Sequence, residues 1–401
     1  MDTQEKVALK VGAICIGNGG GQSGVALHKE GVDVILLNTS SRDLASEVVP
    51  DGVNSYIIQD SNDTGRGAGR NREVAKKLYE DFLQSEKLLT DGTFNKFVKE
   101  KDVIFIIAST AGGTGSGIAP TLAFQLNEKY PNKVIIIIGI LPRLSESINS
   151  QQNSIQFFKE IEQLSEMDIK FPYAFFDLEK YAHLDVDEAY SRVAKDVVDM
   201  VKVIRGDYSR LTKFGMIDER NMLTMICCPG MMTVFALDNI KQSDIKSTGI
   251  QKIILDRMSD ISAADAQSDK ISKYMGLFLE VEDSIDDPVK RADYSELFNT
   301  VGEPFEIFTN YGIAEKPTGS FGVMLTGRSA PYDRLTRAID RVEQHEANKK
   351  EKMYSIQEAS KSFHDYAKND NMGKILGSSN ETPAVKSTPA TRPGFTKSSI
   401  E

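Results

Sequence analysis

The chain has 401 residues, of which 40% are hydrophobic and 26% charged, so it is long enough for two or three domains of about 100 to 200 residues each. Its formal net charge of −10 argues against a broad nucleic-acid-binding surface, because such surfaces owe most of their affinity to Lys and Arg contacts with phosphates. The longest apolar runs, VIFIIA and VIIIIGIL, are much shorter than the roughly 18 residues of a membrane span, so we expect a cytoplasmic protein with no membrane partner.

Short apolar runs alternate with helical patterns in the first part of the chain. The runs lie at 10–17, 33–38, 102–109, 133–141 and 173–178. The helical patterns lie at about 22–30, 69–86, 115–129 and 146–166. Apolar runs without polar alternation are typical of strands buried on both faces, and the repeated strand–helix order predicts a doubly wound parallel α/β sheet. Ligands of such sheets bind outside the carboxyl ends of the strands.

Two glycine-rich strings, GNGGGQSG at 17–24 and ASTAGGTGSGIAP at 108–120, each follow one of these apolar runs. Residues without Cβ let backbone N–H groups approach an anion, and a helix N-terminus behind them adds a positive dipole end. One such string is equally compatible with a tight turn, but two at equivalent strand ends favour a shared polyphosphate site. Neither contains the GxxxxGK of a P-loop. A dinucleotide fold is also a poor match, because the second apolar run ends in Asn38 and Thr39 rather than in an acid.

The order of these loops resembles that of the tubulin and FtsZ superfamily. AGGTGSG at 111–117 resembles its signature GGGTGTG or GGGTGSG, with Ala111 in place of the first glycine. The strings GNGGGQSG, LLNTS, GAGRNREV and LPRLSE follow the superfamily's other nucleotide loops in the same order, with Ser40 in place of an acid. Within the superfamily, LPR and the C-terminal segment 330–355 are similar to the TubZ branch of bacterial plasmids and phages.

The resemblance implies GTP and GDP as ligands, together with Mg²⁺, and assigns no residue to the metal. It implies that Glu146 contacts the ribose, that Tyr190 stacks on the base, and that Asp177 lies near the base. The full set of residues that the resemblance places at the nucleotide is Gly19, Gly20, Gly21, Gln22, Asn38, Ala68, Gly69, Asn71, Gly112, Gly113, Thr114, Gly115, Ser116, Pro142, Glu146, Asp177 and Tyr190.

The second part of the chain predicts a buried helix and a smaller α+β domain. Val193, Val197 and Val201 recur at helical spacing within 185–204, which the resemblance identifies as the central helix of the superfamily. Strand-like runs follow at 231–237, 276–282, 304–309 and 321–327. The expected organisation is a nucleotide-binding domain over 1–184, a central helix over 185–206, an activation domain over 207–329, a C-terminal helix over 330–357 and a flexible tail over 358–401.

The C-terminal region carries an apolar helix face and then loses it. Leu335, Ala338 and Val342 have helical spacing, whereas 343–352 has hardly any apolar residue, which fits a solvated surface helix or a contact with a neighbouring subunit. Residues 371–401 are rich in Ser, Thr and Pro, so we expect disorder. The resemblance implies that this tail binds a DNA-bound adaptor protein, while the body does not read DNA directly.

The superfamily also inserts a loop, commonly NxDxxD, into the nucleotide pocket of the next subunit. The matching stretch here is MIDERN, with Met216, Asp218 and Asn221 in the three positions. The carboxylate of Asp218 would then orient water or help to hold Mg²⁺ in phosphoryl transfer, with Asn221 beside it as the second predicted catalytic residue. The alternative is that Asp218 is a helix N-cap.

These features predict a GTPase that forms head-to-tail filaments for plasmid or phage DNA segregation and hydrolyses GTP at subunit interfaces. An FtsZ-like cell-division filament protein and a nucleotide-binding regulator that does not polymerise are the alternatives.

Overall fold

The computed structural model describes residues 8–45, 47–59, 65–84, 88–167, 169, 171–209, 217–266, 272–281, 294–313 and 318–368. The chain divides into two units, residues 1–343 and residues 344–401. The predicted tail over 371–401, with its adaptor contact, and Met216 lie outside the described residues.

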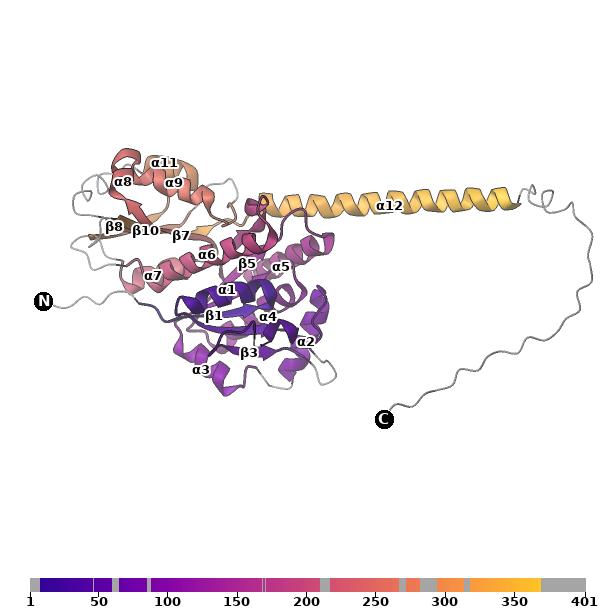
Figure 1. The fold of residues 1–401 in the computed structure, drawn as a ribbon, viewed down its shortest axis with the longest axis horizontal. Helices are drawn as coiled ribbons and strands as arrows, with labels where there is room; N and C mark the ends of the chain where they lie inside the picture. Colours follow the sequence, from indigo (N-terminus) through magenta and orange to yellow (C-terminus); the bar gives the residue numbers. More distant parts are fainter. Residues whose placement is uncertain are drawn as a thin grey trace, which may run out of the picture. The chain divides into compact units, whose positions relative to one another are not determined.

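In the described part of the chain, ten strands form one sheet in the order β3-β2-β1-β4-β5-β6-β7-β10-β8-β9 (Figure 1). The strands are β1 (Val11–Ile16), β2 (Asp33–Asn38), β3 (Asn54–Ile57), β4 (Val103–Ser109), β5 (Val134–Leu141), β6 (Pro172–Asp177), β7 (Gly230–Lys241), β8 (Tyr274–Val281), β9 (Glu306–Ile313) and β10 (Thr318–Arg328). The helices are α1 (Gly17–Lys29), α2 (Arg72–Gln84), α3 (Gly92–Glu100), α4 (Gly113–Lys129), α5 (Ile148–Glu166), α6 (Val186–Arg205), α7 (Glu219–Ile226), α8 (Gln242–Thr248), α9 (Ile250–Asp260), α11 (Ser295–Val301) and α12 (Tyr332–Lys368), with short 3₁₀ turns η1 (Arg42–Leu44) and η2 (Leu178–Tyr181).

The strands from β3 to β7 are parallel, which confirms the predicted doubly wound sheet, and β1, β4, β5 and β6 are buried along almost their whole length. Every residue of β4 is buried. Its side chains alternate between two cores: Phe105 packs in the core that includes α1 and α6, and Ile106 packs in the core that includes α2, α4 and α5. A strand with two buried faces has no polar side to present, which explains the continuous apolar run.

The glycine string at 17–24 is helical, whereas the sequence predicts a loop there with a helix from about residue 22. α1 begins at Gly17, directly after β1. The reason is close packing: a Cβ on Gly20 would lie 2.4 Å from the carbonyl oxygen of Ile107 in β4. Glycine at this position therefore lets the helix lie close to the sheet, as in other strand–helix contacts of this fold class. β3 and α3 are two further elements that the sequence does not predict.

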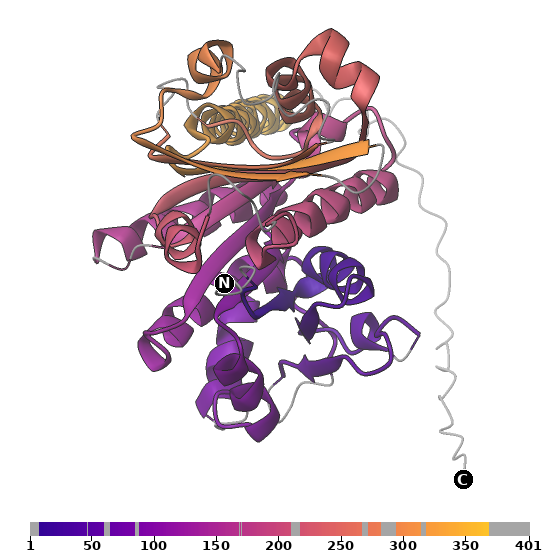
Figure 2. The same cartoon turned by 90° about the vertical axis from the view of Figure 1, so that its left-hand side faces the viewer.

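The strands of the region 207–329, which the sequence predicts as an α+β activation domain, belong to the same sheet. β7 pairs in parallel with β6 at two positions only, Pro172 with Gly230 and Tyr173 with Met231. Beyond this short ladder β7 pairs antiparallel with β10, β10 pairs antiparallel with β8, and β8 pairs parallel with β9. α8, α9 and α11 cover one face of these strands, and α6 covers the other (Figures 1 and 2).

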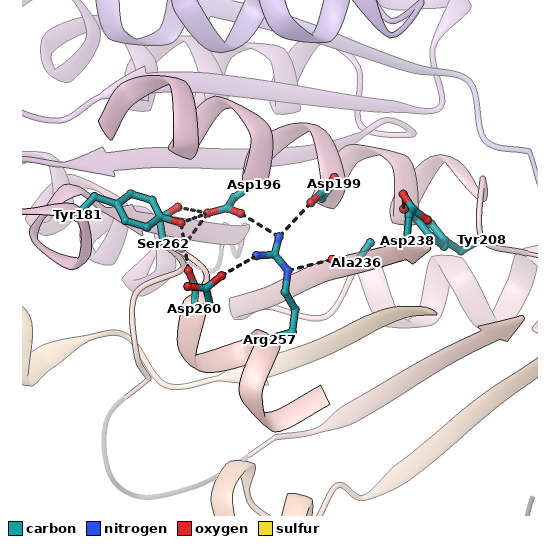
Figure 3. A network of polar contacts seen from close by, with 9 residues as sticks. All are labelled: Tyr181, Asp196, Asp199, Tyr208, Ala236, Asp238, Arg257, Asp260 and Ser262. Atoms are coloured by element: carbon teal, nitrogen blue, oxygen red, sulfur yellow. Dashed lines mark hydrogen bonds and ion pairs between the residues drawn. The ribbon is translucent and has the colours of Figure 1, made fainter. Parts of the chain in front are cut away.

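Where β7 no longer pairs with β6, a cluster of polar side chains connects α9 with α6 (Figure 3). The Arg257 guanidinium donates to Asp196 at 3.2 Å, to Asp199 at 3.1 Å and to the carbonyl oxygen of Ala236 in β7 at 3.0 Å. Asp196 also accepts hydrogen bonds from the Tyr181 hydroxyl and from the backbone and hydroxyl of Ser262. The cluster therefore fastens the second half of the sheet to the central helix.

The predicted helix faces are largely confirmed. The predicted face of α6 is buried at Val193, Val197 and Val201, and Met200 and Ile204 of the same helix are buried as well. In α12 the residues Leu335, Ala338 and Val342 are buried. α12 runs to Lys368, past the predicted end at residue 357, and its side chains from 343 to 361 are exposed. None of the helices in the described part of the chain combines the length and the apolar character that a membrane span requires.

Candidate nucleotide-binding site

A cavity of about 750 Å³ opens at the carboxyl ends of the parallel strands. Its wall includes residues at or just beyond the ends of five neighbouring strands, namely Ile16, Asn38, Ser109, Arg143 and Leu178. This is the position in which doubly wound sheets bind their ligands, and the volume falls in the usual range for small-molecule sites.

Two helices begin at this cavity without a side-chain cap. The N-cap residues of α1 and α4 are Ile16 and Gly112, neither forms a side-chain capping hydrogen bond, and neither helix has an acid in its first turn. Four other helices, α3, α5, α6 and α7, are capped by the side chains of Asp91, Ser147, Asp185 and Asp218. The first-turn N–H groups of α1 and α4 therefore lack the side-chain oxygen that accepts from them in those four helices, and they are available to an anion.

Hydroxyl groups connect the loops around these helix starts. The Thr39 and Thr114 hydroxyl oxygens lie 2.7 Å apart, and Thr39 also accepts from the backbone N–H of Ala68 at 3.0 Å. These contacts join the end of β2, the loop before α2 and the first turn of α4. The Asn38 amide donates to Asp43 at 3.2 Å, which brings a carboxylate to the same wall of the cavity.

Charged residues of both signs line the cavity. The cations are Arg66, Arg70 and Arg143, and the carboxylates are Asp43, Glu146 and Asp187. The Arg143 guanidinium is held in the wall by the carbonyl oxygens of Tyr181, Leu184 and Asp185, at distances from 2.9 to 3.0 Å. Arg66 and Arg70 are exposed at the cavity, where they add positive charge near the glycine-rich helix starts.

Asn153 of α5 fixes two of the loops that line the cavity. Its amide nitrogen lies 3.0 Å from the carbonyl oxygen of Arg70 and 2.9 Å from that of Ala111, and the side chain is buried. Sequence reasoning did not identify Asn153, Thr39, Arg66 or Arg70. The available signal was the polar run NSQQNS, which continues the helical pattern of α5 with buried polar residues where a packed helix normally places apolar ones.

Most of the residues predicted to contact the nucleotide line this cavity. They are Gly19, Gln22, Asn38, Ala68, Gly69, Gly112, Gly113, Thr114, Gly115, Glu146 and Tyr190. Tyr190 comes from α6, its hydroxyl lies 3.4 Å from that of Ser109, and burial raises its pKa. The Glu146 carboxylate accepts from the backbone N–H of Arg143 at 3.1 Å.

Four other predicted residues, Gly20, Gly21, Asn71 and Ser116, do not line it. Gly20 packs on β4, and Gly21 lines a smaller neighbouring cavity. The Asn71 side chain accepts from the first N–H groups of α2 at 3.0 and 3.3 Å, as a helix cap. The Ser116 hydroxyl donates back to the carbonyl oxygens of the first turn of α4.

Pro142 and Asp177 also lie outside the lining, because both are engaged by Arg334 of α12. The Arg334 Nε lies 2.7 Å from the Asp177 carboxylate, and its Nη2 donates to the Pro142 carbonyl oxygen. Arg334 and Asp177 are both buried. Burial raises the pKa of Asp177, and the facing guanidinium opposes that rise. Asp177 is thus an ion-pair partner in the core rather than a side chain in the cavity.

Asp218 and Asn221, the predicted catalytic residues, lie at the start of α7 and do not line the cavity. They form a capping box, so the helix-cap alternative describes their arrangement within one chain. The Asp218 side chain is exposed.

Comparison with known proteins agrees with this fold. Residues 10–175 match the Tubulin/FtsZ family, GTPase domain. The chain is 34% identical over 131 residues to the tubulin-like protein CetZ5 of Haloferax volcanii, covering 32% of each. It is 30% identical over 129 residues to the tubulin-like protein TubZ of Clostridium botulinum C phage, covering 32% of this chain and 33% of the relative. The matches thus span about a third of the length of these curated relatives.

The structural likeness extends over more of the chain. A solved structure of CetZ2 from Haloferax volcanii, described as a GTPγS-bound protofilament, gives a TM-score of 0.65 at 19% identity and covers 84% of this chain and 100% of that one. At this identity the likeness establishes the fold. The family match covers residues 10–175, which include β1, β2, β4 and β5 and most of β6, so this part of the chain is similar to the Tubulin/FtsZ GTPase domain.

Proposed function

We propose that this protein is a GTPase that polymerises head to tail and hydrolyses GTP where one subunit meets the next. The observation that carries the proposal is the pair of uncapped helix N-termini, α1 and α4, at one cavity among the cations Arg66 and Arg70. Backbone N–H groups and helix dipoles bind phosphates in many nucleotide-binding proteins, and positive side chains add to that attraction.

The cavity offers a separate group for each part of a nucleoside triphosphate. The N–H groups at the starts of α1 and α4 would bind the phosphates. Glu146 would accept hydrogen bonds from the ribose hydroxyls, and Tyr190 would stack on the base. The match of residues 10–175 to the Tubulin/FtsZ GTPase domain supports guanine as the base.

Mg²⁺ fits this site as an ion shared between protein and phosphates. Within the described ranges, no group of three His, Cys, Asp or Glu residues is placed to hold a metal. Mg²⁺ at phosphate sites usually takes only one or two carboxylates, with phosphate oxygens and waters as its other ligands. Asp43 is the candidate, because it shares a smaller cavity with Gly17, Asn18 and Gln22 at the start of α1. The ion would neutralise charge that develops on the phosphates.

Polymerisation would complete the site. A subunit's own cavity does not include Asp218, which is exposed at the start of α7 and is free to face another chain. The CetZ2 structure described as a protofilament supports self-association of this fold. Asn221 occupies the position of the superfamily's second acid, so we expect slow hydrolysis.

The biological role that we propose is plasmid or phage DNA segregation. It is supported by the sequence match to the phage TubZ and by the LPR motif at 141–143. In this role, residues 371–401 would bind a DNA-bound adaptor protein.

Assembly measured by light scattering and electron microscopy tests the proposal. Full-length protein with Mg²⁺ should give filaments and a rise in scattering with GTP, but neither with ATP nor with GDP, and phosphate release should begin only above the concentration at which filaments form. A chain that binds GTP and stays monomeric would instead be the nucleotide-binding regulator. Failure to bind GTP at all would overturn the proposal.

A further inference from the structure

The first turns of α12 hold the loop that forms one wall of the candidate nucleotide cavity. This loop, residues 142–147, connects β5 with α5, and its members Arg143, Ser145, Glu146 and Ser147 line the cavity. The Arg341 Nη2 of α12 donates to the carbonyl oxygens of Ser145 and Glu146, at 3.3 and 3.1 Å. Arg341 therefore contacts two consecutive backbone carbonyl groups, and the second of them belongs to Glu146.

Arg334 anchors α12 two turns earlier. It forms a buried ion pair with Asp177 and donates to the Pro142 carbonyl oxygen, at the start of the same loop. Charge-assisted hydrogen bonds from a guanidinium are stronger than neutral ones, and a buried pair is expensive to break from one side. Arg334 thus fixes the position of α12 against the ends of β5 and β6. Because Arg341 lies on the same helix, this contact also places Arg341 beside the loop.

Arg341 is less buried than Arg334, and not all of its N–H groups form hydrogen bonds with described residues. It is half-buried, and its Nε has no hydrogen-bond partner among the described residues. Its interaction with the loop is therefore made through one nitrogen, directed at two carbonyl groups. Removing this side chain would free the Ser145–Glu146 peptide without opening the core at Arg334.

We propose that Arg341 is a positioning residue for nucleotide binding: by holding the carbonyl groups of Ser145 and Glu146, it sets the place of the Glu146 carboxylate opposite the ribose. The C-terminal helix thereby determines how well the cavity discriminates a ribose from a sugar without hydroxyl groups. This inference rests on the proposed function, since it assigns a role at the same nucleotide site.

The test compares the affinities of GTP and 2′,3′-dideoxy-GTP for full-length wild type, Arg341→Ala, Arg341→Lys and Arg337→Ala, measured by calorimetry. Arg337 is the matched control, because it is a cation on the same helix that lies between Arg334 and Arg341 and is exposed. Wild type should bind GTP about tenfold more tightly than the dideoxy compound. In Arg341→Ala that ratio should fall toward one, Arg341→Lys should keep part of it, and Arg337→Ala should equal wild type. Unchanged thermal unfolding would show that the variants are folded.

The outcomes separate this inference from the proposed function. If wild type binds neither compound, the proposed function fails. If wild type discriminates and Arg341→Ala discriminates equally, the nucleotide site stands and the role of Arg341 is wrong. A uniform loss of affinity for both compounds in Arg341→Ala would also overturn it, because a general structural effect weakens both alike. Equal binding of the two compounds by wild type would contradict the ribose contact of Glu146 and with it the inference.

Discussion

Asp218 and Asn221 close a reciprocal pair of hydrogen bonds at the start of α7. The Asp218 carboxylate accepts from the Asn221 backbone N–H at 2.7 Å, and the Asn221 side chain accepts from the Asp218 backbone N–H at 3.2 Å. The same carboxylate is the group that the proposed mechanism places in the next subunit's cavity. Helix capping and catalysis are therefore two roles of one side chain, and suitable variants separate them.

Asp218→Asn should preserve the cap and remove the charge. Asn is as good an N-cap as Asp, so stability should remain within about 0.5 kcal/mol of wild type. Loss of a group that positions the reactants typically slows turnover by a factor of about 100 or more. Phosphate release by assembled filaments should fall accordingly while GTP binding persists. Turnover at the wild-type rate in Asp218→Asn filaments would leave capping as the only role of the residue.

Gly20→Ala and Gly21→Ala form a matched pair on α1. A Cβ on Gly20 meets the backbone of β4, whereas a Cβ on Gly21 has no atom within 4 Å. Gly20→Ala should therefore lower the free energy of unfolding by about 1 to 3 kcal/mol. Gly21→Ala should raise it by about 0.5 to 1 kcal/mol, because Ala favours the helix. Urea unfolding would measure both, and equal effects at the two positions would contradict the helix–sheet contact.

Asn153→Ala should destabilise the protein more than Asn149→Ala. Both amides donate to the carbonyl oxygen of Arg70, but Asn153 is buried and also donates to Ala111, whereas Asn149 is exposed. Loss of the buried donor deprives the Ala111 carbonyl group of this hydrogen bond and costs about 1 to 3 kcal/mol, against about 0.5 kcal/mol at the surface. GTP affinity should fall with Asn153→Ala, because two cavity loops lose their common support. A larger effect from Asn149 would reverse this assignment.

Asp199 predicts a pH dependence of stability. Burial raises its pKa from 3.8 to about 6, with Asp196 and Asp238 adding to the rise and Arg257 and Lys195 opposing it. Figure 3 shows Asp199 with Asp196, Asp238 and Arg257. Between these two values the folded state holds a proton that the unfolded state has lost. The contribution of Asp199 to the free energy of unfolding is therefore largest below about pH 4. It decreases by roughly 3 kcal/mol as the pH rises through about 6.

The variant Asp199→Asn tests whether ionisation of Asp199 lowers the stability as the pH rises. The amide oxygen still accepts from Arg257, but it does not ionise. The free energy of unfolding of the variant, minus that of wild type, should therefore increase between about pH 4 and pH 7. Urea unfolding at several pH values measures the difference, in which the other titrating groups cancel. A difference that stays constant, or that decreases with pH, would contradict the raised pKa.

The sequence predicted those helices and strands whose burial is visible in their own residues. The apolar runs of β1, β2, β4, β5 and β6 are continuous because both faces are buried, and burial on both faces is visible in the residues themselves. β3 is a short edge strand with two exposed and two half-buried residues, so it carries no such run. The glycine string of α1 was interpreted as a loop because a glycine that packs on a strand and a glycine in a turn look the same in a sequence.

Contacts between distant residues account for the rest. Asp177 and Arg334 are 157 positions apart, and no local pattern could show that the carboxylate would be paired inside the core. The loops that line the cavity were predicted in order by family resemblance, which gave Thr114 and Glu146 but not Arg66 or Arg70. Exposed cations at a cavity follow no helical or strand periodicity in the sequence. Their place at the cavity can therefore be seen only in the folded structure.

The two-residue ladder between β6 and β7 has a consequence for the way the protein opens. β1 and β4 share six paired positions, and β4 and β5 share seven, whereas β6 and β7 share two. Amide hydrogens of β4 should exchange with solvent only when the whole unit unfolds, but those of Gly230 and Met231 should exchange through a smaller opening along this line. The match to the GTPase domain ends at residue 175, within β6. The sheet should therefore separate first between β6 and β7, close to the position at which the match to that domain ends.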